Sequence, residues 1–202
     1  LAHIRSMKNL IFSLALVVSI NAYGQEPKAM AIGSKAPEIE AIDNSGSTFS
    51  LTEKLKQGPA VVIFYRGEWC PYCNKHMSQL EESIGKFKDL GVSVVAIAPE
   101  LPEYVEKSVK KSKASFSVIS DPNHQVMDAW NVSFRLDDET YKRYKKWGIN
   151  LERASGNEDR ILPVPATYII GTDGTIKHVH FDPNYKERMP VSEMLEILGK
   201  KQ

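Results

Sequence analysis

Two cysteines, Cys70 and Cys73, are the only ones in the chain, and two residues separate them. Before them, residues 60–65 form an apolar, β-branched run typical of a buried strand, and an amphipathic helical pattern follows. At such a junction the first thiol lies at a helix N-terminus, where unpaired N–H groups and the helix dipole favour the thiolate. The second thiol lies about one turn further on and can attack a mixed disulfide formed at the first. The pattern predicts a redox-active dithiol.

Two other interpretations of the cysteine pair are weaker. A structural zinc site needs four ligands, and the addition of His178 and His180 would give a His-x-His pattern that lacks the usual ligand spacing. A purely structural disulfide over so short a loop would restrict the unfolded chain very little. We therefore expect neither a metal nor another cofactor.

Several neighbours of the pair are candidates for roles in its chemistry. We expect Cys70 to be the attacking thiolate, exposed at the helix start, and Cys73 to be the resolving partner, shielded by the first turn. Pro71 suits that turn because a missing N–H costs little there. Arg66, four residues before Cys70, would lower the pKa of that thiol and stabilise the leaving oxygen of a peroxide, unless it is an exposed arginine at a strand end. Trp69 is expected to pack beside the sulfur.

Four further residues have less certain places in the site. Tyr72 either gates access and forms hydrogen bonds, or only packs. Glu68 would raise the thiol pKa if it lay close. Arg160 is a second candidate cation that would approach from the loop before Pro165. His76, six residues after the first cysteine, fits neither helical spacing of three nor of four and is predicted to lie on the helix surface.

Composition indicates one globular domain. The chain has 202 residues and a formal net charge of +1, which gives no electrostatic argument for binding nucleic acid or an anionic surface. Residues 1–24 are of a different type and are interpreted as a signal peptide. Residues 25–31 form a short polar linker, and residues 32–202 form the domain.

The N-terminal segment has the three parts of a secretory signal. A basic start at Met7 and Lys8 precedes an apolar run over residues 10–20, and small residues follow up to Gly24. Residues 1–6 are expected to lie upstream of the true start. The apolar run is too short to span a bilayer of about 30 Å as a helix. We therefore expect export to the periplasm or the extracellular space, with membrane attachment only if the segment is not cleaved.

Strands and helices alternate along the domain and predict an α/β fold with a mixed central sheet flanked by helices. Strands are expected over 38–42, 47–51, 60–65, 92–98, 115–120, 166–170 and 176–181. Helices are expected from 71 to Gly91 and over 103–113, 124–130, 138–147 and 191–198. The first two strands form an N-terminal β-hairpin. This order, with the cysteine pair after an early central strand, is thioredoxin-like.

A helical insertion at about 134–160 interrupts this order. Its helix carries Tyr141, Tyr144 and Trp147 on one side. One interpretation is a surface helix that packs its aromatic residues onto the domain. The other is a lid or a surface for a partner protein.

The sequence resembles the peroxiredoxin-like branch of the AhpC/TSA family. The resemblance rests on residues 32–37, on residues 58–73 with the cysteine pair, on the insertion, and on residues 162–170. It implies a thioredoxin fold, a nucleophilic Cys70, and antioxidant or thiol–disulfide chemistry with a thioredoxin-type protein as reductant. It also implies a cis peptide bond between Val164 and Pro165, which would point backbone groups of Val164 at the substrate. The alternative is an ordinary trans-proline at a strand start.

One departure from the family pattern affects the expected substrate. Peroxiredoxins carry a Pro-x-x-x-Thr-x-x-Cys box whose threonine hydroxyl orients the peroxide, but Ile63 and Gly67 occupy the first and fifth positions here. Cys-Pro-Tyr-Cys is instead the pattern of glutaredoxins. Two mechanisms remain open, both ending in a Cys70–Cys73 disulfide: reduction of a hydroperoxide, which we favour narrowly, and exchange with a protein disulfide. A third hypothesis is a non-catalytic binding module that docks through residues 134–160.

Overall fold

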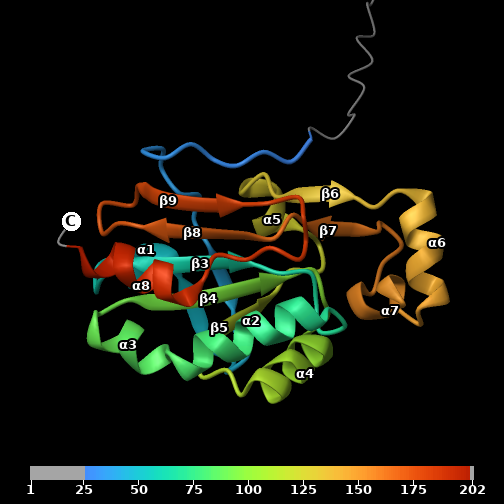
Figure 1. Cartoon of the computed structure of the whole chain (residues 1–202), viewed down its shortest axis with the longest axis horizontal. Coiled ribbons are helices and arrows are strands. Elements are labelled where there is room, and N and C mark those ends of the chain that lie inside the picture. The colour runs from blue at the N-terminus through green and yellow to red at the C-terminus, as the bar shows by residue number, and fades with distance from the viewer. Residues whose placement is uncertain (1–25, 201–202) are drawn as a thin grey trace, which may run out of the picture.

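The computed structural model describes residues 26–200 (Figure 1). The predicted signal peptide, residues 1–24, lies outside the described residues. No helix between residues 26 and 200 combines the length and the apolar character needed to cross a membrane.

A five-stranded mixed sheet forms the centre of the domain, as predicted. Its strand order is β5 (Ser117–Ser120), β4 (Ser93–Ala98), β3 (Ala60–Phe64), β8 (Ala166–Ile170) and β9 (Ile176–Phe181). β3 runs parallel to β4 and antiparallel to β8, and Phe64 pairs with Ile97 and with Ala166. In this register the loop after β3 lies beside residues 163–165, which precede β8. That loop leads to the cysteines.

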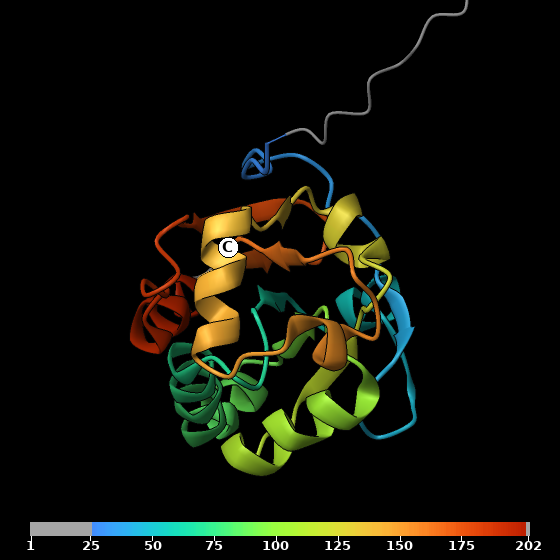
Figure 2. The same ribbon diagram turned by 90° about the vertical axis from the view of Figure 1, so that its right-hand side faces the viewer.

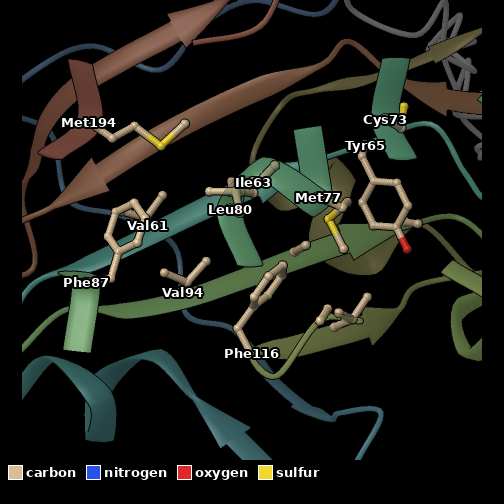
Figure 3. Packing of buried hydrophobic residues seen from close by; sticks show 14 of the residues in the cluster. Val61, Ile63, Tyr65, Cys73, Met77, Leu80, Phe87, Val94, Phe116 and Met194 are labelled. Atoms are coloured by element: carbon tan, nitrogen blue, oxygen red, sulfur yellow. The ribbon is translucent and has the colours of Figure 1, made fainter. Parts of the chain in front are cut away.

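Every residue of β3 is buried, because helices cover both faces of the sheet. Val61 and Ile63 face the side covered by α2 (Pro71–Glu82), α3 (Ile84–Asp89), α4 (Pro102–Ser112) and α8 (Val191–Gly199) (Figures 1 and 3). Val62 and Phe64 face the other side, since successive strand residues point to opposite faces. That side holds α5 (Gln125–Ala129), α1 (Leu51–Leu55) and the predicted hairpin of β1 (Glu40–Ile42) and β2 (Thr48–Ser50).

The single helix predicted from residue 71 to Gly91 is two helices. Ser83 separates α2 from α3 and is both the C-cap of the first and the N-cap of the second. The apolar spacing continues across this break, since Leu80 and Phe87 both lie in the same core cluster. Periodicity alone therefore did not reveal the interruption.

The helical insertion forms a separate layer across one end of the sheet (Figure 2). It contains α6 (Asp138–Lys146) and α7 (Leu151–Ser155), between the paired strands β6 (Ser133–Arg135) and β7 (Ile161–Pro163). The two strands were not predicted. Tyr141 and Tyr144 are buried in a small apolar cluster that Trp69 contacts, whereas Trp147 is 62% exposed. Two of the three aromatic residues thus pack onto the domain.

Candidate active site

The cysteine pair lies where the loop after β3 enters α2. Cys70 is the N-cap residue of α2, Pro71 occupies its first turn, and Cys73 follows in that turn. Both cysteines are free thiols, and each is 1% exposed. The prediction of an exposed Cys70 is therefore wrong, because Cys70 belongs to the apolar core cluster that also contains Met77.

The two thiols shift each other's pKa. The interaction with the Cys73 side chain, together with burial, raises the pKa of Cys70. Burial alone would raise the pKa of Cys73, but the hydrogen bond from Cys70 and the positive charge of Arg188 lower it to about 6. The pair therefore carries one negative charge at neutral pH. That charge is on Cys73, so the prediction that Cys70 is the thiolate is wrong for the resting pair, and Cys70 becomes the nucleophile only when its proton passes to Cys73.

Arg188 reaches the pair from the segment between β9 and α8. Its Nη2 lies 3.2 Å from Cys73 Sγ, within hydrogen-bond distance. Its Nη1 donates to the backbone carbonyls of Tyr185, at 2.6 Å, and Glu187, at 2.5 Å. Backbone carbonyl groups of this segment thus hold the Arg188 side chain, and its guanidinium points at the Cys73 sulfur. No sequence pattern identified Arg188.

Arg66 lies on the other side of the pair and is 2% exposed. Its guanidinium carbon lies 4.8 Å from the ring centre of Trp69, 5.4 Å from that of Tyr144 and 4.2 Å from that of Tyr185, and it donates a hydrogen bond to the Tyr144 hydroxyl. Burial lowers the pKa of Arg66, while the neighbouring charge of Cys70 opposes that shift. The alternative of an exposed arginine at a strand end is wrong.

Neither Arg66 nor Arg188 forms a salt bridge with a carboxylate in the described part of the chain. A buried guanidinium costs free energy unless an anion or hydrogen bonds compensate its charge. The thiolate shared by Cys70 and Cys73 is the anion that the geometry provides. The site is therefore built to hold negative charge on sulfur, or on an oxygen that leaves from it.

A cavity of about 540 Å³ lies in front of Arg66. Residues of α6, the strand ends and the segment after β9 line it, among them Tyr144, Trp147, Pro165 and Tyr185. A larger hollow of about 970 Å³ borders Val164 on the side of Glu26 and Asn131. We assign substrate entry to the smaller cavity, because Arg66 lines it and the Arg66 charge interacts with both cysteines.

The predicted cis peptide bond between Val164 and Pro165 is wrong, since residues 26–200 contain none. Val164 N–H donates to the carbonyl of Val132 at 2.8 Å, which continues the β6–β7 pairing up to the proline. The preceding residues are thus held as an extended strand. Pro165 lines the candidate substrate cavity, as its place before β8 requires.

The remaining predicted residues divide between the site and its surroundings. Trp69 packs against Tyr144 with ring centres 5.4 Å apart. Tyr72 is 39% exposed and meets Tyr185 edge to face at 5.9 Å, so it lies at the rim of the site. Arg160 is paired with Asp138 and does not contact the thiols.

His76 is 3% exposed, so the prediction of a helix-surface residue is wrong. Residues before α8 pack over α2 at this point, and the carbonyl oxygen of Met189 lies 3.2 Å from His76 Nε2. Burial lowers the pKa of His76 to about 4, which keeps the ring neutral at physiological pH.

A buried carboxyl group, Glu100, lies behind the loop that carries Glu68. Glu100 is 1% exposed, and its Oε2 accepts a hydrogen bond from the backbone N–H of Glu68 at 2.8 Å. Sequence reasoning missed this residue, although an acid shortly after a buried strand is a usable signal, since functional residues gather at the carboxyl ends of strands in α/β sheets. The Glu68 side chain turns away and pairs with Lys111.

Glu100 also bears on the missing threonine. Gly67, which occupies the threonine position, has a φ of +143°, and a Cβ there would lie 2.5 Å from Glu100 Oε1 and 2.7 Å from Trp69 Nε1. A side chain at this position would therefore collide with both groups, in a backbone conformation that favours glycine. In this arrangement, Glu100 and Trp69 occupy the space that a threonine side chain at this position would need.

The arrangement is that of a thioredoxin-fold protein with two free thiols at the start of a helix. Residues 32–179 match the AhpC/TSA family model. The chain belongs to the AhpC/TSA family.

The relatives carry names from both of the chemistries considered above. Chloroplastic peroxiredoxin Q of Populus jackii is 33% identical over 166 residues, which cover 82% of this chain and 67% of that protein. Chloroplastic peroxiredoxin Q of Oryza sativa subsp. japonica is 27% identical over the same length, and the match spans only 65% of it. Thiol-disulfide oxidoreductase ResA of Geobacillus kaustophilus is 25% identical over 155 residues, covering 76% of this chain and 71% of that protein.

Solved structures agree on the fold. Peroxidoxin BcpB from Mycobacterium tuberculosis superposes with a TM-score of 0.64 at 19% identity, over 84% of this chain and 95% of that one. A peroxiredoxin-like protein from Aquifex aeolicus gives a TM-score of 0.65 at 16% identity, over 87% and 90% of the two chains. The predicted thioredoxin-like fold is confirmed.

Proposed function

We propose that the protein is a thiol peroxidase that reduces hydroperoxides through Cys70, with Cys73 as the resolving cysteine. The observation that carries the proposal is the buried guanidinium of Arg66, which has a thiolate rather than a carboxylate as its neighbouring anion. Membership of a family with peroxiredoxin relatives supports it. The dithiol that reduces the enzyme is proposed to belong to a thioredoxin-type protein.

The first step is the attack of the Cys70 thiolate on the terminal oxygen of the hydroperoxide. The O–O bond breaks, Cys70 becomes a sulfenic acid, and the other oxygen leaves as an alkoxide or hydroxide that takes up a proton. Arg66 lines the cavity and its charge interacts with Cys70, so its guanidinium can stabilise the leaving oxygen. This replaces the threonine hydroxyl that Gly67 cannot supply.

The second step forms the disulfide. Cys73, in the same helical turn, attacks the Cys70 sulfenic acid, and its thiol proton leaves with the sulfenic oxygen as water. The proximity of the two sulfurs, already joined by a hydrogen bond, makes large rearrangements unnecessary. A partner dithiol then returns two electrons and opens the disulfide.

The second candidate function is exchange with protein disulfides. The absence of the box threonine at Gly67 favours it, as does the match to a thiol-disulfide oxidoreductase. In that reaction Cys70 attacks the substrate disulfide, and Cys73 then releases the reduced substrate. The 540 Å³ cavity would serve as a docking groove for the substrate chain.

We also propose that the protein acts outside the cytosol. The support is the basic start, short apolar run and small residues of residues 1–24. A dithiol in an oxidising compartment needs a dedicated reductant in order to cycle. The test expresses the full chain in a bacterial host, separates periplasm from cytosol, and determines the N-terminus of the protein by mass spectrometry. Protein that stays in the cytosol with an intact N-terminus would contradict the proposal.

The deciding experiment mixes the pre-reduced protein rapidly with hydrogen peroxide and, separately, with an oxidised protein disulfide. Trp69 adjoins Cys70 and should report oxidation through its fluorescence, with Cys70→Ser as the blank. Cys73→Ser should stop at the sulfenic acid, which dimedone traps and mass spectrometry detects. Rapid oxidation by peroxide with slow exchange supports the peroxidase. Rapid exchange with slow peroxide oxidation would make the protein a disulfide oxidoreductase.

A further inference from the structure

Glu100 is a buried carboxyl group that uses only one of its two oxygens. Among residues 26–200, its Oε1 and the nearby Trp69 Nε1 are buried without a hydrogen-bond partner. Tyr65 lies close to Ser108 and within electrostatic range of both Glu100 and Cys73. Buried polar atoms are nearly always satisfied, so an unpaired carboxyl oxygen directly behind the loop that leads to the cysteines requires an explanation.

A small cavity joins Glu100 to the wall of the site. Its volume is about 10 Å³, and Glu100, Trp69 and Arg66 are among its lining residues. That volume is at the lower limit for one water molecule. A water there would contact the Glu100 carboxyl group and the indole N–H, which links the carboxyl to the guanidinium of Arg66.

The charge on the cysteine pair changes during the proposed cycle. The reduced pair carries one negative charge, and the disulfide carries none. Burial, the first cause, raises the pKa of Glu100 to about 8, and the Cys73 charge acts in the same direction. Oxidation removes that charge, so the carboxyl group then ionises more readily. The structure thus contains two buried acidic groups whose ionisation is mutually opposed.

We propose that Glu100 is the proton store of the redox centre, protonated while the cysteine pair is reduced and ionised while the pair is a disulfide. The inference rests on the reversible oxidation of Cys70 and Cys73 in the proposed function, and it applies to either oxidant. Glu100 acts through the thiols and does not contact the substrate. Its role is to hold a proton for the cysteine pair.

The proton balance closes without a proton from solvent. A dithiol reductant delivers two electrons and two protons to the disulfide; one proton stays on the thiol and the other goes to the Glu100 carboxylate. On oxidation, one hydroperoxide reacts with the reduced pair, which consists of one thiol and one thiolate, and the Glu100 carboxylic acid supplies a proton. The products are the disulfide, the carboxylate, one alcohol and one water, and the Glu100 proton ends on the leaving alkoxide.

Other charged groups face Glu100 from the surrounding elements. Glu68, on the loop after β3, raises its pKa, and Lys107 of α4 lowers it. Arg66 and Arg160 line the small cavity. Lys111 neutralises Glu68 through its ion pair, so the Glu68 charge is compensated. The group that changes charge within the proposed cycle is the cysteine pair, which is why the coupling is assigned to it.

The test compares wild type with Glu100→Gln, which keeps the shape and removes the titrating proton. The matched control is Glu103→Gln, an exposed acid in the first turn of the neighbouring helix α4. The midpoint potential of the cysteine pair is measured in dithiothreitol buffers between about pH 6 and 9. We expect wild type and the control to bind about two protons per pair reduced below about pH 8, and Glu100→Gln to bind about one.

Equal proton uptake in wild type and Glu100→Gln would overturn the proposal. If Glu100→Gln does not fold, redox difference infrared spectroscopy of wild type labelled with ¹³C-glutamate decides. A labelled carboxylic acid band that appears on reduction at pH 7 supports the proposal, and its absence refutes it. Dithiothreitol replaces any natural partner here, so slow reaction with peroxide would refute the peroxidase function while leaving the proton uptake measurable.

Discussion

The cysteine pair lies between two walls that differ in charge and in origin. The outer wall consists of Arg66, Tyr144, Tyr185 and Arg188, and it brings two guanidinium groups to the sulfurs. The inner wall consists of Tyr65, Glu100 and Ser108, and it holds a carboxyl group that burial favours in its neutral form. The thiols thus face cations on one side and an acid on the other.

The two walls come from different parts of the fold. Most of the outer wall is supplied by α6 in the insertion and by the segment before α8. The inner wall follows from the ends of β3 and β4 and from α4, which belong to the central layers. Arg66 is the exception, since it follows Tyr65 on the loop after β3, so this one loop supplies a residue to each wall.

The largest effect is expected from Arg66→Met on the outer wall. It removes the guanidinium that lines the cavity and whose charge interacts with Cys70, and loss of one such charge stabiliser costs about a hundredfold in rate. Stopped-flow measurement of oxidation by hydrogen peroxide checks this. Arg153→Met is the matched control, because Arg153 is an exposed arginine of α7 that does not line this cavity. Equal rates in the two variants would remove Arg66 from the mechanism.

A smaller, pH-dependent effect is expected from Arg188→Gln. The Arg188 charge helps to hold the pKa of Cys73 at about 6, so wild type keeps its thiolate down to that pH. Without Arg188 the pKa rises, and the thiolate is lost at higher pH as the solution is acidified. We expect about a tenfold loss of activity near pH 6, fading above about pH 9.

Thiolate absorbance at 240 nm, followed through a pH titration, measures this shift directly. Lys186→Gln is the control, since Lys186 is exposed in the same segment. An unchanged thiolate titration in Arg188→Gln would mean that the outer wall acts through Arg66 alone.

The smallest effect is expected from Tyr144→Phe. The ring that packs against Trp69 and Arg66 remains, but the hydroxyl that accepts a hydrogen bond from Arg66 is lost. One hydrogen bond to a charged group contributes about 1.5 kcal/mol, so the rate of oxidation by peroxide should fall about tenfold at most. Tyr141→Phe, on the same helix, should leave that rate unchanged, and an equal loss there would indicate disturbance of α6.

The sequence was informative where the site is local in the chain. The β-branched run over β3 and the following helix put the cysteine pair at the start of a helix after a buried strand, as predicted, although Cys70 is buried and not exposed. The central sheet followed from the alternation of strands and helices.

The rest of the site depends on contacts between distant segments. Arg188 lies in an irregular segment without periodicity, and packing of that segment over α2 also buries His76. Glu100 follows a buried strand, which is a usable signal, but its burial behind Gly67 depends on the fold. The trans bond at Pro165 reflects the unpredicted β6–β7 pairing, which fixes the preceding residues.

The two guanidinium groups without carboxylate partners also influence the reduction potential of the cysteine pair. Arg66 and Arg188 gain a counter-charge when the pair holds a thiolate and lose it when the disulfide forms. Stabilisation of the reduced form makes a disulfide a stronger oxidant. The cysteine pair should therefore accept electrons from a partner dithiol readily, so that oxidised protein does not accumulate while reductant is present.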